Sequence, residues 1–190
     1  MSLDTVELIV SIERYFKLQM PDSIAETLRT VGDVAAWLGQ QLGTTAARNS
    51  TVRGAVAAHL QALLPAPPET PVLRLIPDKA AHAEVAARLL ESSGLVLPAL
   101  SFTKRQSPGG WLDILLGKPV PPAELALARY TLADLIDWTV AANYKQLLHS
   151  PLESQYDVEQ AVIGLTSESS GVAVFDVKLS SSFTDDLGMD

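Results

Sequence analysis

The sequence predicts an all-α fold. Apolar residues recur at helical spacing in several segments, and period-2 alternation is almost absent. The chain has 190 residues, of which 47% are hydrophobic, so it can bury a core. It contains no cysteine, which excludes a disulfide framework, a thiolate metal site and a cysteine nucleophile.

The first predicted helix covers residues 3–16, where apolar positions follow helical spacing and charged residues lie on other faces. Pro21 lies in the break that follows it. Thr30 is expected to cap the next helix, because Asp33 can reach back and complete a variant of the capping box. That helix should end near Gly43.

The rest of the chain divides into short helices and linkers. Residues 44–51 are rich in Thr, Asn and Ser and predict a linker. Further helices are expected over residues 52–64, 79–93, 131–148 and 157–169, with loops at 103–110 and 117–122 and a proline-rich extended segment at 65–71.

Charge is distributed unevenly along the chain. The net charge of −8 argues against nucleic acid or anionic lipid as the main partner. Residues 2–42 and 155–190 together hold 13 acids and 4 bases, whereas residues 43–154 hold 9 acids and 10 bases. No apolar run approaches the ~20 residues of a membrane span, and no leader pattern is present, so the cytoplasm is the expected location.

Residues 2–8 read Ser-Leu-Asp-Thr-Val-Glu-Leu, and this stretch resembles the sequence that follows the modified serine in bacterial acyl carrier proteins. The similarity continues without a gap to the helix that contains Trp37. In that family these residues form helices II, III and IV. Residues 158–190 resemble the family's helix I and the loop that precedes the serine, also without a gap.

Joining Asp190 to Ser2 recreates the family's Asp-Ser-Leu attachment motif across the two chain ends. The resemblance therefore implies a circularly permuted four-helix carrier domain built from residues 2–43 and 155–190. A second small helical unit, residues 52–148, would be inserted between its two parts.

The inserted unit is interpreted as a degenerate carrier-like repeat. Residues 29–37 parallel residues 130–138, and 18 residues separate Lys79 from Pro98, as they do Ser2 from Pro21. In this alignment Lys79 takes the serine position, so the inserted unit could not be modified there.

The resemblance implies that Ser2 accepts 4′-phosphopantetheine from coenzyme A and that the thiol of this arm carries acyl groups, as in fatty acid or polyketide metabolism. Asp190 would help hold Mg²⁺ during the transfer. The implied partners are a phosphopantetheinyl transferase and acyl-processing enzymes. A Met-Ser-Leu start is also common in recombinant proteins as a cloning remnant, so a native and an introduced Ser2 are both considered.

Several acids match the positions at which the family docks basic patches of partner enzymes, although Arg14 stands where the family usually has another acid. The alternative is an ordinary solvated helix face. The predicted docking residues are Asp4, Glu7, Glu13, Asp22 and Glu26.

No enzyme is expected. The three histidines lack metal-ligand spacing, and no Ser/His/Asp nucleophile motif is found. The apolar residues of the matching helices, Val6 and Phe16 among them, are expected in the core. Two functions remain: a pantetheinylated carrier of acyl groups, or an unmodified adaptor with a carrier fold. The permuted domain could close within one chain or form a domain-swapped homodimer.

Overall fold

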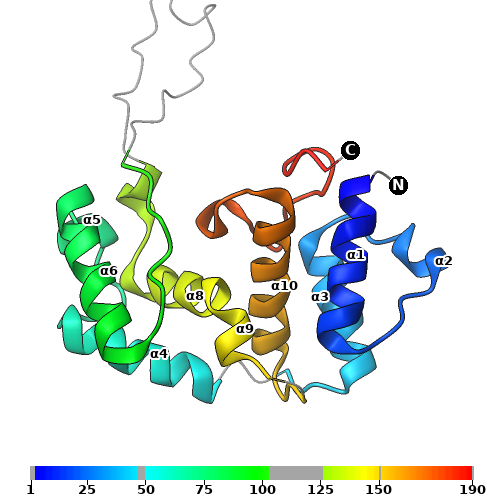
Figure 1. The fold of residues 1–190 in the computed structure, drawn as a ribbon, viewed down its shortest axis with the longest axis horizontal. Helices are drawn as coiled ribbons and strands as arrows, with labels where there is room; N and C mark the ends of the chain where they lie inside the picture. Colours follow the sequence, from blue (N-terminus) through cyan, green and yellow to red (C-terminus); the bar gives the residue numbers. More distant parts are fainter. Residues whose placement is uncertain (1–2, 47–49, 103–125, 150, 190) are drawn as a thin grey trace, which may run out of the picture.

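The computed structural model describes residues 3–46, 50–102, 126–149 and 151–189 (Figure 1). In this part of the chain there are isolated β-bridges but no strands, so the predicted all-α class is confirmed. The helices are α1 (Leu3–Phe16), α2 (Asp22–Ala25), α3 (Val31–Leu42), α4 (Thr51–Leu63), α5 (Val72–Leu75), α6 (Lys79–Ser93), α8 (Leu132–Ala142), α9 (Tyr144–Leu147) and α10 (Gln155–Ser170), with 3₁₀ turns η1 (Ala126–Arg129) and η2 (Val174–Asp176).

The ends of α3 follow the predicted signals. The Thr30 hydroxyl accepts a hydrogen bond from the N–H of Asp33 at 3.1 Å, and the Asp33 carboxylate accepts one from the N–H of Thr30 at 2.9 Å. Burial opposes ionisation of Asp33, but these hydrogen bonds outweigh it and hold the pKa of its carboxyl below the usual value. Gly43 ends the helix at φ 66, a left-handed conformation that suits glycine.

The single helix expected over residues 131–148 is wrong, because the structure divides it at Asn143 into α8 and α9. The side-chain oxygen of Asn143 accepts a hydrogen bond from the N–H of Val96, and its amide donates to the Val96 carbonyl, both at 2.8 Å. The Asn143 side chain thereby attaches the segment that follows α6 to the junction between α8 and α9.

Helix α10 lies at the centre of the molecule (Figure 1). It packs against α1 and α3 on one side and against α8 on the other, while α4 packs against both α6 and α8. Most of its residues are buried on both sides, including Tyr156, Val162 and Leu165. One cluster of buried apolar residues consequently runs from α1 and α3 through α10 into α4, α6 and α8.

Val6 departs from its predicted role. It was expected in the core, but its side chain is 41% exposed, and Val10 one turn later is 44% exposed. The buried face of α1 is instead made by Leu8, Ile12 and Phe16. None of the helices in the described ranges has the length and apolar character needed to cross a membrane.

Candidate functional site

The first turn of α1 and the loop 182–189 lie together, and they form the candidate site. The hydroxyl of Thr5 donates a hydrogen bond to the carbonyl oxygen of Met189, with an O–O distance of 3.2 Å. Ser2 and Asp190, the two residues expected at the attachment motif, lie outside the described residues. Their described neighbours, Leu3 and Met189, are thus the residues that border the site.

The loop is held in shape by its own hydrogen bonds. The N–H of Ser182 donates to the Asp186 carboxylate at 2.9 Å, and the N–H of Asp185 donates to the Ser182 hydroxyl at 3.3 Å. The N–H of Met189 donates to the Phe183 carbonyl at 2.8 Å. Asp185 and Asp186 therefore act as turn residues here, and their loop holds the side chains of Phe183 and Met189 in the core.

The chain just before this loop is bonded to the start of α3. The N–H of Val31 donates to the Ser181 carbonyl at 3.1 Å, and that of Gly32 donates to the Leu179 carbonyl at 2.7 Å. The Phe183 N–H returns a bond to the Arg29 carbonyl at 3.2 Å. The first two bonds satisfy N–H groups of the first turn of α3, which have no acceptor within the helix.

The N-terminal end of α1 suits a phosphate ester. Helix α1 begins at Leu3, and the N–H groups of a first helical turn lack acceptors within the helix. Together with the helix dipole they favour a negatively charged oxygen. The donors at the start of α1 therefore fit the phosphate of a 4′-phosphopantetheine attached at residue 2.

Four of the five predicted docking acids lie at the surface, on α1 and around α2. Glu13 is the exception: it is half-buried, and its carboxylate accepts a hydrogen bond from the N–H of Met20 at 2.7 Å. That bond stabilises the turn between α1 and α2, where Lys17 adopts φ 55. The exposed acids are Asp4, Glu7, Asp22 and Glu26.

A small cavity lies behind α1. Its volume is about 20 Å³, close to the space of one water molecule, so the core is nearly closed there. An acyl chain would have to open this space. Its lining is mainly apolar and consists of Thr5, Leu8, Ile9, Ile12, Met20, Ala25, Leu28, Val34 and Phe183.

The bonds at the start of α3 have counterparts at the start of α8. The N–H of Leu132 donates to the Thr70 carbonyl at 2.9 Å, and that of Ala133 donates to the Pro68 carbonyl at 2.8 Å. The Val72 N–H returns a bond to the Tyr130 carbonyl at 2.8 Å. At both helices the carboxylate of an aspartate in the first turn, Asp33 or Asp134, also accepts a hydrogen bond from the N–H of the capping threonine. The two junctions share one hydrogen-bond pattern.

The position aligned with Ser2 differs in chemistry. Asp78 caps α6 by accepting a hydrogen bond from the N–H of Ala81 at 2.8 Å. Lys79 follows as the first residue of α6, and its side chain is exposed.

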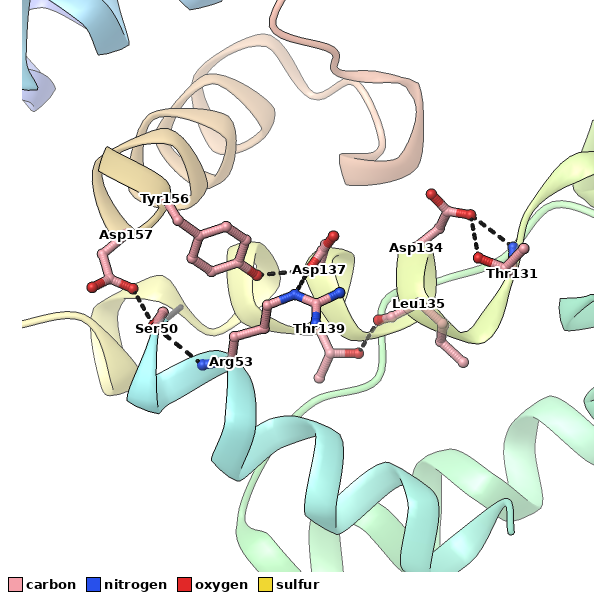
Figure 2. A network of polar contacts seen from close by, with 9 residues as sticks. All are labelled: Ser50, Arg53, Thr131, Asp134, Leu135, Asp137, Thr139, Tyr156 and Asp157. Carbon is pink, nitrogen blue, oxygen red and sulfur yellow. Dashed lines mark hydrogen bonds and ion pairs between the residues drawn. The ribbon is translucent and has the colours of Figure 1, made fainter. Parts of the chain in front are cut away.

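A polar network that the sequence did not reveal joins α4, α8 and α10 (Figure 2). Asp137 accepts hydrogen bonds from the guanidinium of Arg53 and the hydroxyl of Tyr156, both at 2.7 Å. Ser50 donates to Asp157 at 2.6 Å. Burial, reinforced by the charge of Asp137, raises the pKa of Tyr156 well above its ordinary value. In the described part of the chain no cluster of acids or histidines could hold a metal ion.

Comparison with known proteins identifies the segment that carries the candidate site. The profile of a family described as "Phosphopantetheine attachment site" matches residues 2–38. The start of α1 thus belongs to a segment similar to carrier-protein attachment sites, and the match supports 4′-phosphopantetheine as a covalently attached prosthetic group.

The similar proteins are acyl carrier proteins. The chain is 43% identical over 42 residues to an acyl carrier protein of Phenylobacterium zucineum, covering 22% of this chain and 53% of that protein. It is 49% identical over 37 residues to a mitochondrial acyl carrier protein of Saccharomyces cerevisiae, covering 20% and 30%. The chain therefore spans about half or less of the length of these relatives. No solved structure matches.

Proposed function

We propose that this protein is an acyl-group carrier whose carrier domain is built from residues 2–43 and 155–190, with 4′-phosphopantetheine on Ser2. The family match that begins at residue 2 is the observation that carries the proposal. The arm would supply a thiol for acyl groups. The chain itself would bind the phosphate at the start of α1. It would also hold the loop 182–189, which precedes the serine in the family's order, next to that helix.

The order of the helices in space supports a circular permutation. The resemblance assigns α10 to helix I and α1, α2 and α3 to helices II, III and IV, and α10 packs on both α1 and α3. The Thr5–Met189 hydrogen bond supports the proposal that Asp190 lies near Ser2. From there Asp190 would help hold Mg²⁺ during attachment of the arm. A domain-swapped homodimer would make the same contacts between two chains.

Acyl-processing enzymes and a phosphopantetheinyl transferase are the proposed partners. Asp4, Glu7, Asp22 and Glu26 expose four carboxylates that complement a basic patch, which speeds encounter more than it adds affinity. Glu13 would contribute its charge while keeping its bond to Met20. The cytoplasm stays the expected location, although the similar yeast protein is named mitochondrial.

Residues 52–148 are proposed to be a degenerate copy of the carrier domain. The matching bonds at the starts of α3 and α8 support this, as does the packing of α4 on α6 and α8, which parallels that of α10 on α1 and α3. With Lys79 in place of the serine, this copy would serve as a scaffold for α10.

Intact mass after co-expression with a broad-specificity transferase tests the proposal. The expected result is one phosphopantetheine increment in the wild type and none in Ser2→Ala, with the natural residues that precede and follow Ser2 retained. If the wild type gains no mass while coenzyme A is present, the unmodified adaptor replaces the carrier. Light scattering on the same samples distinguishes a monomer from the swapped dimer.

A further inference from the structure

A surface groove of about 580 Å³ lies between α1, α9 and α10. Its size is within the range of small-molecule sites. It shares no lining residue with the small cavity behind α1. The groove therefore opens on a different side of α1 from the side that packs in the carrier core.

Aromatic and aliphatic side chains give the groove an apolar wall. The rings of Tyr15 and Tyr144 pack edge to face with centroids 5.2 Å apart, and Leu165 is buried beside them. The Tyr15 hydroxyl donates to the Leu148 carbonyl, and the Tyr144 hydroxyl donates to the Glu168 carboxylate at 2.7 Å. Because both phenols are held by hydrogen bonds, this wall is preformed.

The charged residues of the groove leave one positive charge unbalanced. Lys145 pairs with Glu168 at an N–O distance of 2.6 Å. Hydrogen bonds from Lys145 and Tyr144 hold the pKa of Glu168 below its usual value, so its carboxylate stays ionised and offsets the positive charge of Lys145. Arg14 also lines the groove, is exposed, and has no ion-pair partner among the described residues.

We propose that this groove binds a small molecule with an apolar body and a single oxyanionic group, either a carboxylate or a phosphate ester. The apolar body would lie along Tyr15, Tyr144 and Leu165, and the oxyanion would accept hydrogen bonds from Arg14. A guanidinium offers two parallel donors that match a carboxylate or a phosphate. The groove carries an unbalanced positive charge although the whole chain has a net charge of −8, and this local charge favours an anion at this site. The proposal does not depend on the carrier function.

Titration of the full chain with octanoate, octyl phosphate and octanol, followed by NMR shifts of the Tyr15 and Tyr144 rings, tests the head group. At least one anion should bind about tenfold more tightly than octanol, as a charge-assisted hydrogen bond requires. The stronger of the two anions identifies the head group. Equal binding of octanol, or no saturable shift with any probe, would overturn the proposal.

Two variants locate the site. Arg14→Gln should weaken the favoured anion about tenfold and leave octanol unchanged, whereas the control Arg74→Gln, at an exposed arginine on α5, should change neither. Ser11→Trp fills the groove from α1 and should abolish binding of every probe, while an unchanged circular dichroism spectrum verifies its fold. Anion binding that survives both Arg14→Gln and Ser11→Trp would show that the groove is not the site.

Discussion

Gly164 on α10 lies so close to Ala141 on α8 that a Cβ at position 164 would be 2.4 Å from the Ala141 carbonyl oxygen. No real Cβ occupies such a position, so the two helices can approach this closely only with glycine there. The contact joins the helix that the proposed carrier domain uses as its helix I to the helices of residues 52–148.

Gly164→Ala should therefore destabilise the protein by about 1–3 kcal/mol, because the methyl group forces α10 away from α8. The control is Gly54→Ala on α4, where an added Cβ meets no atom within 4 Å. At position 54 the preference of a helix interior for alanine over glycine should stabilise the protein by about 0.5–1 kcal/mol. Urea denaturation measures both. Equal effects of the same sign would contradict the close packing.

Phe183→Ala should cost about 3–5 kcal/mol, since Phe183 is a buried ring that anchors the loop 182–189 behind α1. Leu179→Ala, at a side chain 36% exposed, should cost less than about 1 kcal/mol. Thermal melts of the two variants give the comparison. A Phe183→Ala protein that melts with the wild type would mean that this loop adds nothing to the core.

Stability should fall as the pH rises from about 10 to 12. Burial, with a smaller contribution from the charge of Asp157, raises the pKa of Tyr15 to about 12, whereas the unfolded chain ionises near the ordinary value of 10. Between these values the unfolded state has lost the proton that the folded state keeps, which favours unfolding. Below pH 10 the contribution is complete. Tyr15→Phe should flatten this part of the pH profile in urea denaturation; an identical slope would refute the assignment.

Glu7→Lys should slow the association with a basic partner enzyme, and the defect should shrink as salt is added, because the exposed carboxylate acts by long-range attraction. Glu91→Lys is the matched control, because Glu91 is an exposed acid on α6, and Figure 1 shows α6 at the opposite end of the molecule from α1. Stopped-flow association rates at low and high salt distinguish them. If Glu91→Lys slows association as much as Glu7→Lys does, docking is not localised to α1.

Lys79→Ser should not create a second site of modification. The new hydroxyl would follow Asp78, as a carrier serine requires. The exposed acids of α6 are Glu84, which pairs with Arg88 at 3.9 Å, and Glu91, so α6 offers less unpaired negative charge than α1 and α2. Intact mass in the Ser2→Ala background gives a clean measurement. A phosphopantetheine increment in that double variant would show that the transferase reads the Asp-Ser pair alone.

Local signals allowed most helix boundaries to be predicted. The Thr30–Asp33 capping box and Gly43 act within a few residues, so a sequence reveals them directly. The break at Asn143 depends on Val96, 47 residues away, and the Asp137–Arg53 pair spans 84 residues. No periodicity encodes such contacts.

The candidate site also has features that the sequence predicts and features that depend on distant contacts. The exposure of Asp4 and Glu7 follows from helical spacing, and it was predicted. The role of Glu13 depends on the turn that carries Met20 back to it, and Val6 is exposed because the apolar face of α1 turns toward α10 and the loop 182–189. Spacing alone does not fix the direction of that face.

The central place of α10 also has a consequence for protein synthesis. A ribosome makes α1, α3, α4, α6 and α8 before it reaches Gln155, yet the apolar faces of α1 and α3 pack against α10 and the loop 182–189, which are made last. Contacts between residues so distant in the chain form slowly, because the entropy of closing a long loop comes first. The apolar faces of α1 and α3 should therefore stay exposed on the nascent chain until translation passes Ser170. During that interval the chain should be prone to aggregation and depend on chaperones.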